Sequence, residues 1–271
     1  MTEEREDATY VIRSGAAALE RLELIARLFR PSTLEWLEMN EAFGTGRLLD
    51  VGCGIGDVAG LTALAGAKEA LGIDVNDDVV AAATERARTA GTGAHFRVAG
   101  IADLGAGDLT DFDVVYTRCV ISHLPDPRAA LSAMLSAAAP GGLVVVEDVE
   151  VAATWCSPPD RDVDRYVECY LAAAQAIGAS PRVGPEIAAI LQEVGATDVA
   201  VDLVQPVLRT PEDLAIMPRT MEAIAGSVVN SGVADAHEVA ALVARLDTWA
   251  STSGVVATLP RIVQVCARRP E

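Results

Sequence analysis

Aromatic residues, lysines and long apolar runs are all scarce in this sequence. Phe, Trp and Tyr supply 4% of the 271 residues, so the core must be built from Ala, Val and Leu. Lys68 is the single lysine. No apolar run approaches the ~18–20 residues that a membrane-spanning helix needs. The polar, acidic start MTEERED does not resemble a signal or transit peptide, so we expect a cytoplasmic protein.

Basic residues are also fewer than acidic ones. The chain has 21 Lys and Arg residues against 39 Asp and Glu residues, a formal net charge of −18. A field of that sign repels phosphate backbones and anionic lipid headgroups. We therefore expect neither nucleic-acid nor membrane partners. The charge favours neutral or cationic small molecules over polyanions.

Cysteine and histidine lack the spacing of metal sites and disulfide frameworks. The five cysteines are odd in number and form no CxxC pair, and the three histidines are far apart with no HExxH. These patterns predict no disulfide framework and no metal centre. Apolar residues make up 51% of the chain, so a core can form without either, and a disordered chain is excluded.

Short apolar runs alternate with helical stretches between residues 45 and 150. Apolar strands that alternate with helices are typical of a parallel sheet covered on both faces. The predicted strands are Arg47–Gly52, Ala70–Asp74, His95–Ala99, Phe112–Thr117 and Leu143–Val149. The predicted helices between them are Asp57–Ala67, Asp77–Ala90 and one that Asp126 caps and Gly141-Gly142 end.

The two flanks have a different pattern. Residues 1–44 are predicted as a helical lid, with one helix over Ala16–Arg30 and a second that a Ser32–Glu35 capping box opens after Pro31. Residues 151–271 are predicted as helical cap insertions plus two final strands, Val199–Leu208 and Val255–Ala267. We expect the three parts, 1–44, 45–150 and 151–271, to form one integrated domain.

A glycine-rich turn follows the first predicted strand. The segment LLDVGCGIGD has GxGxG spacing, and Asp57 stands where dinucleotide-binding loops have their third glycine. A carboxylate there repels a pyrophosphate, which disfavours a nicotinamide oxidoreductase and favours an adenosine cofactor without phosphates. Asp74 ends the second strand, where an acid can accept hydrogen bonds from both ribose hydroxyls.

Four segments in this order resemble motifs of the class I S-adenosylmethionine (SAM) methyltransferases. They are LLDVGCGIGDVA, ALGIDV, FDVVYTRCVISHLPDP and PGGLVVVED, within residues 47–150. YVIRSG and VCARRP, near the two ends, resemble small-molecule methyltransferases of bacterial specialised metabolism. The resemblance implies an α/β fold, with a Rossmann-like, doubly wound, mostly parallel seven-stranded sheet, a last antiparallel strand and a helical cap. It implies SAM as cofactor and S-adenosylhomocysteine (SAH) as product.

The resemblance also implies which residues meet the cofactor. The glycine loop would surround the methionine and adenosine moieties, Asp74 would hold the ribose diol and Val75 would pack on the adenine. The family commonly has Gly-Asp-Ala after the third strand, but Ile101 replaces the Asp here and cannot bond the adenine amino group. The implied set is Tyr10, Arg13, Asp50, Gly52, Cys53, Gly54, Gly56, Asp74, Val75, Ile101, Ala102 and Arg118.

Fewer residues are candidates for the chemistry. His123, after the fourth strand, is the candidate general base, although a positional role fits it as well. Glu147, on the fifth strand, is a candidate to orient a substrate hydroxyl or amine, with a solvent-facing acid as the alternative. Trp155, Tyr166 and Tyr170 are candidates to line the substrate pocket. The i, i+4 spacing of the two tyrosines equally fits core packing.

Methyl transfer to an O, N or C atom of a small, natural-product-like molecule is the function that these patterns favour. TRCV stands where amino-methyltransferases of nucleic-acid bases have NPPY. SAM-assisted cyclisation or decarboxylation on the same fold stays open, as does a non-catalytic partner protein. The long flanking helices leave a homodimer open.

Overall fold

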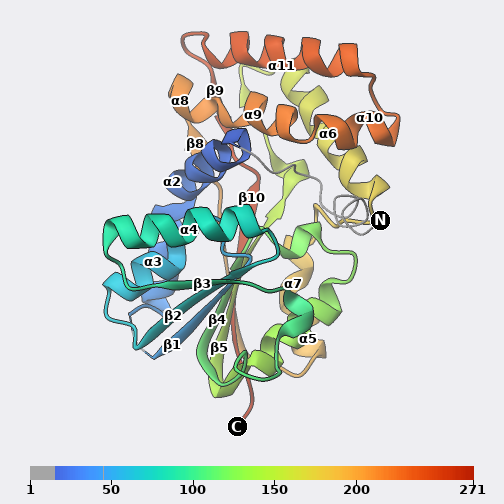
Figure 1. Ribbon diagram of the computed structural model, residues 1–271. Coiled ribbons are helices and arrows are strands. Elements are labelled where there is room, and N and C mark those ends of the chain that lie inside the picture. Colours follow the sequence, from blue (N-terminus) through green and yellow to red (C-terminus); the bar gives the residue numbers. More distant parts are fainter. Residues whose placement is uncertain (1–15, 45) are drawn as a thin grey trace, which may run out of the picture.

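A seven-stranded sheet lies at the centre of the computed structural model, which describes residues 16–44 and 46–271 (Figure 1). The strand order is β3-β2-β1-β4-β5-β10-β7. The first five are parallel, whereas β10 runs antiparallel to both β5 and β7. The predicted Rossmann-like sheet is thus confirmed. The strands are β1 (Arg47–Val51), β2 (Glu69–Asp74), β3 (His95–Val98), β4 (Phe112–Arg118), β5 (Ala138–Glu150), β7 (Thr197–Val204) and β10 (Arg261–Arg268).

Helices cover both faces of this sheet (Figure 1). On one face lie α3 (Asp57–Leu64), α4 (Asp77–Ala90) and the second half of α2 (Ala16–Met39), whose Trp36 and Leu37 pack against strand residues. On the other lie α5 (Pro127–Ala137) and α7 (Ile187–Glu193), through Leu131 and Leu191 among others. Burial on both faces explains why the parallel strands read as continuous apolar runs.

The cap stands beyond the carboxyl ends of the parallel strands (Figure 1). Its helices are α6 (Arg161–Ala176), α8 (Pro211–Leu214), α9 (Ile216–Ala223), α10 (Ala225–Ser231) and α11 (Ala236–Ala250). A small sheet joins them, ordered β6 (Cys156–Ser157), β9 (Val256–Thr258) and β8 (Val207–Leu208). The first half of α2 enters this core, because Leu24 and Phe29 are buried in the same cluster as Tyr166, Met217 and Leu246.

One helix replaces the two predicted before residue 45. Helix α2 runs without a break from Ala16 to Met39 and contains Pro31. The predicted capping box is therefore wrong. The Ser32 hydroxyl donates instead to the carbonyl of Phe29 at 3.0 Å, back along the helix, and Thr33 turns inward with 1% exposure.

Other boundaries also differ from the prediction, and helix α3 ends at Leu64 rather than Ala67. Helix α5 ends at Ala137, and Gly141-Gly142 lie inside β5. The strand predicted over Val199–Leu208 is interrupted before β8, and the one over Val255–Ala267 is interrupted after β9. Pro206 and Pro260 stand at these two breaks. A proline cannot donate to a strand ladder, so the chain passes from the large sheet to the small one at Pro206 and back to the large sheet at Pro260.

Within residues 16–44 and 46–271, no helix is both long and apolar enough to cross a membrane. The same residues contain no group of three or more His, Cys, Asp or Glu side chains placed to hold a metal ion.

Candidate active site

The glycine loop forms the floor of the candidate site at the carboxyl end of β1. Gly52 has φ of +68° and Gly54 has φ of +52°, a region that favours glycine. A Cβ on Gly52 would stand 2.3 Å from the Val120 side chain, whereas one on Gly54 would meet only Leu22, at 3.8 Å. The loop thus packs closely against the segment after β4 at Gly52, and at Gly54 it faces Leu22 of α2.

Asp74 joins the end of β2 to this loop. One carboxylate oxygen accepts from the backbone N–H of Gly54 at 3.2 Å, and the other accepts from that of Asn76 at 3.0 Å. Burial raises the pKa of Asp74, and these backbone hydrogen bonds act against the rise. Each carboxylate oxygen has a further lone pair. The structure therefore places Asp74 at the glycine loop with acceptor capacity to spare.

The residues expected around an adenine gather next to Asp74. Val75 is 73% exposed, the largest exposure among the apolar side chains described as exposed. A Cβ on Gly100 would lie 3.1 Å from the Val75 side chain. Ile101 packs partly against the sheet core, and the Ala102 side chain is exposed. Asp103 accepts from the Gly100 N–H at 2.8 Å, so the acid nearest to Ile101 is engaged with the backbone.

Asp50 and Cys53 lie beneath the loop surface. Asp50 accepts from the N–H of Ala59 at 3.2 Å and is 3% exposed. Burial raises the pKa of Asp50 to about 7, against the lowering effect of the Arg118 charge. Cys53 is also buried, and burial raises the pKa of its thiol. Both side chains support the turn from below.

Glu147 is at the centre of a buried hydrogen-bond network. Its carboxylate accepts from the Thr33 hydroxyl and from the Gln264 amide, each at 2.7 Å, and from the Tyr116 hydroxyl. Glu147 is 1% exposed. Three protein donors take up this carboxylate, so the expectation that it orients a substrate is corrected. It joins α2 to three strands of the sheet.

Arg118 connects that network to the glycine loop. Its guanidinium donates to the Thr33 hydroxyl at 3.0 Å, stands 4.0 Å from a carboxylate oxygen of Asp57, and lies 5.7 Å from the centre of the Phe29 ring. Asp57 also pairs with Arg30 of α2 at 2.5 Å. The Asp57 carboxylate is therefore compensated by two cations, which weakens the electrostatic argument that it repels a pyrophosphate.

His123 lies on a short turn that follows β4. Cys119 begins this turn with φ of +55°, an uncommon conformation for a residue other than glycine. Asp148 of β5 is 0% exposed and accepts from the Ser122 N–H at 3.1 Å. Burial, and then the charge of Arg21, lower the pKa of His123 to about 4. His123 is thus a neutral imidazole at pH 7.

The aromatic candidates divide into two groups. Tyr166 and Tyr170 are each 7% exposed and belong to the cap core, which supports core packing for both. Trp155 is 46% exposed, and its backbone N–H donates to the Thr258 hydroxyl at 3.2 Å. Tyr10 and Arg13 lie outside the described residues.

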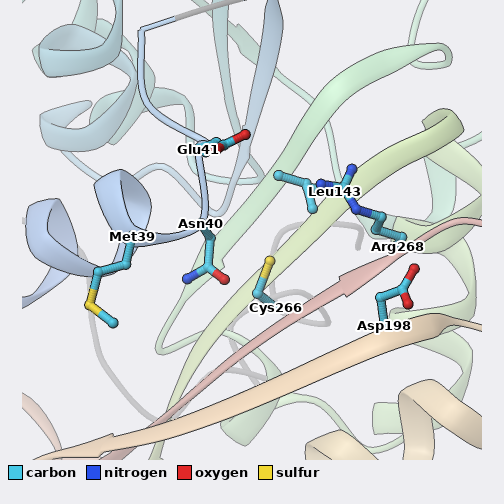
Figure 2. Close-up of a pocket in the computed structure, with 7 residues that line it drawn as sticks. All are labelled: Met39, Asn40, Glu41, Leu143, Asp198, Cys266 and Arg268. Atoms are coloured by element: carbon cyan, nitrogen blue, oxygen red, sulfur yellow. The ribbon is translucent and has the colours of Figure 1, made fainter.

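A surface pocket of about 320 Å³ lies elsewhere on the molecule. Figure 2 shows its lining residues, which come from the end of α2 and the two residues after it, and from β5, β7 and β10; they are Met39, Asn40, Glu41, Leu143, Asp198, Cys266 and Arg268. Leu143 and Arg268 are paired across β5 and β10, toward the amino end of β5. This pocket is therefore remote from the glycine loop.

Comparison with known proteins identifies the part of the chain that carries this loop. Residues 44–176 match the family model described as "Methyltransferase domain". These matched residues are called the methyltransferase domain below. A Methylococcus capsulatus "Ubiquinone biosynthesis O-methyltransferase" is 32% identical over 114 residues, which are 42% of this chain and 48% of that protein. The chain thus spans about half the length of this curated relative.

Solved structures agree on the fold of the methyltransferase domain. The YcgJ protein from Bacillus subtilis has a TM-score of 0.58 at 15% identity, covering 87% of this chain and 96% of the other. The [4+2]-cyclase SpnF has a TM-score of 0.55 at 21% identity, covering 89% and 81%. At these identities the likeness concerns the fold alone.

Sequence reasoning missed two polar residues of α2 that border the methyltransferase domain's site. Thr33 was assigned to the capping box that does not form. Arg21 is not among the residues predicted for the site, yet it is 7% exposed. Its signal in the sequence is its place three residues before Leu24, which turns it toward the same buried side of the helix.

Proposed function

We propose that this protein transfers a methyl group from SAM to an oxygen, nitrogen or carbon atom of a small organic molecule. One observation carries the proposal: the Asp74 carboxylate is bonded to the glycine loop at Gly54, 3.2 Å from its N–H. An acid that touches this loop and retains free lone pairs suits a ribose diol. The family match and the fold support the same class of reaction.

The residues present fit SAM, the cofactor of this class of methyltransferase. A Cβ on Gly52 would lie 2.3 Å from the Val120 side chain, and one on Gly56 would lie 2.4 Å from the Phe96 ring. Only glycines therefore allow the loop its close turns. When bound, SAM supplies a methyl group activated by a sulfonium. Asp74 and Val75 would hold the ribose and adenine, and Arg118 would face the methionine carboxylate, with Ile101 and Ala102 beside the ring.

The chain's own contribution to catalysis is alignment, exclusion of water and proton handling. His123 is the candidate to accept a proton from an acceptor group, because it is neutral at pH 7. Its pKa of about 4 makes it a weak base, so its larger contribution is to orient the acceptor by a hydrogen bond. The general-base role stays a prediction.

Replacing His123 with alanine is expected to lower kcat at least tenfold with little change in SAM affinity. The pKa of His123 is about 4, so its imidazole stays neutral above about pH 5. If His123 acts while neutral, its protonation should cause no change in the wild-type kcat above that pH. The measurement is kcat against pH for both proteins, alongside SAM affinity. Unchanged turnover in the variant would remove His123 from the chemistry.

The function is tested by calorimetric titration of the purified protein with SAM, SAH and NAD, after any copurified nucleoside has been removed. We expect micromolar affinity for SAM and SAH and none for NAD. A panel of phenols, amines and carbon acids is then incubated with methyl-labelled SAM. Label transferred in step with SAH formation supports methyl transfer. A changed product without label favours cyclisation or decarboxylation, and failure to bind SAM favours a non-catalytic protein.

A further inference from the structure

Arg21 is the most buried arginine of the described residues, with 7% exposure. Its Nε donates to the Thr220 hydroxyl at 3.0 Å. No carboxylate of residues 16–44 or 46–271 lies within 4.0 Å of its guanidinium, although most other arginines in these segments have such a partner. A guanidinium keeps its proton at any physiological pH. The structure therefore holds a permanent, largely buried positive charge here.

This cation stands between the cap and the residues that follow β4. Tyr166 of α6 forms a hydrogen bond with the same Thr220 side chain. The Arg21 charge acts to lower the pKa of Tyr166, against the effect of burial. The same charge acts to lower the pKa of the Cys119 thiol and of the His123 imidazole. Between those two residues lies Val120, the side chain that meets Gly52. Arg21 thus faces the edge of the sheet where a methyl group would be delivered.

The guanidinium retains donors for a ligand. Only Nε has a hydrogen-bond partner among the described residues. Burying an unpaired charge is costly. That cost is offset when an anion completes the site.

We propose that Arg21 binds a carboxylate of the methyl-accepting substrate, so that the substrate is a small organic monoacid. This inference rests on the proposed function. Two free Nη groups on a planar fork match the two oxygens of a carboxylate. The neighbouring apolar side chains, Leu24, Tyr166 and Met217, suit the uncharged body of such an acid.

A single cation favours a monoanion over a phosphate ester. Glu147 and Asp148 lie in the same region of β5, and the whole chain carries −18, so a dianion would meet repulsion that one guanidinium does not balance. The charge of the whole chain favours neutral or cationic substrates, but the local charge at Arg21 has the opposite sign. Within a few ångströms the local charge dominates, because solvent screens the distant acids.

The test compares acids with their uncharged amides on the SAH-saturated protein. The probes are acetate, benzoate, phenylacetate and 4-hydroxybenzoate, each paired with its primary amide, and affinities come from calorimetry. We expect at least one acid to bind the wild-type protein tenfold or more tightly than its amide. Arg21→Met should abolish that preference and Arg21→Lys should retain part of it. Arg219→Met, an exposed arginine beside Thr220, should leave it unchanged.

Two readouts keep the outcomes distinct. SAM affinity should be the same within threefold in all three variants, since Arg21 is not placed in the cofactor site. If Arg21→Met does not fold, Thr220→Val serves instead, because it removes the acceptor of Nε and should weaken the preference severalfold. A wild-type protein that binds SAM without preferring any acid, or a preference that survives in Arg21→Met, would overturn the inference. Absence of SAM binding would overturn the proposed function, and an acid preference that persists in the protein without SAH would then leave Arg21 as a carboxylate site of another function.

Discussion

Replacing Asp74 with alanine is expected to weaken SAM binding at least tenfold, or by about 1.4 kcal/mol. The carboxylate sits at the end of β2 and accepts the Gly54 N–H at 3.2 Å, so the variant loses both a ribose acceptor and a tie that shapes the loop. Asp74→Asn retains size and one acceptor oxygen and should lose less. Calorimetric titration with SAM and with SAH measures both effects.

Asp78→Ala is the matched control for Asp74. Asp78 is an exposed acid in the first turn of α4, only four residues away, and removing it changes the net charge equally. We expect it to bind SAM as the wild-type protein does. Wild-type affinity in Asp74→Ala, with cooperative unfolding retained, would show that the ribose is held by other groups.

Replacing Glu147 with alanine is expected to cost about 3–5 kcal/mol of unfolding free energy, the range for breaking a buried charged network. The change leaves the Thr33 hydroxyl, the Tyr116 hydroxyl and the Gln264 amide without their common acceptor. Each buried donor left unsatisfied costs about 1–3 kcal/mol. Urea unfolding followed by circular dichroism measures the difference.

Glu150→Ala provides the comparison on the same strand. Glu150 pairs with Arg261 at 3.0 Å, but both side chains are partly exposed, and exposed pairs contribute about 0–1 kcal/mol. A loss below about 1 kcal/mol in Glu147→Ala would contradict the network as a stabilising unit. In that case water must reach the three donors.

Much of the sheet and of its flanking helices could be predicted from the sequence, because their starts and ends depend on nearby residues. Helix α4 begins and ends where predicted, since the Asn76 side chain accepts the Val79 N–H at its start and Gly91, with φ of +64°, ends it. The Asp126 cap of α5 is likewise formed. Strand β2 and its terminal Asp74 follow from one apolar run beside a glycine-rich turn.

What the sequence does not reveal depends on contacts between distant residues. Thr33 and Glu147 are 114 positions apart, and Arg21 and Thr220 are 199 apart. The Ser32–Glu35 segment fits both a capping box and the interior of a longer helix with a buried hydroxyl. Only the packing of α2 on the sheet decides between these two structures. Glu147 and Asp148 alternate between the two faces of β5, and periodicity alone does not say which protein donors await each one.

The unbroken course of α2 has a mechanical consequence. Its 24 residues make a rod of roughly 36 Å at 1.5 Å per residue. On this helix, Leu22 faces the glycine loop. The adjacent Arg21 is bonded to the cap, and Thr33 is bonded to the sheet. A ligand that displaces the rod on one side changes the space on the other. If SAM and its substrate bind on these two sides, as proposed, any effect of one on the affinity of the other is reciprocal and of equal size.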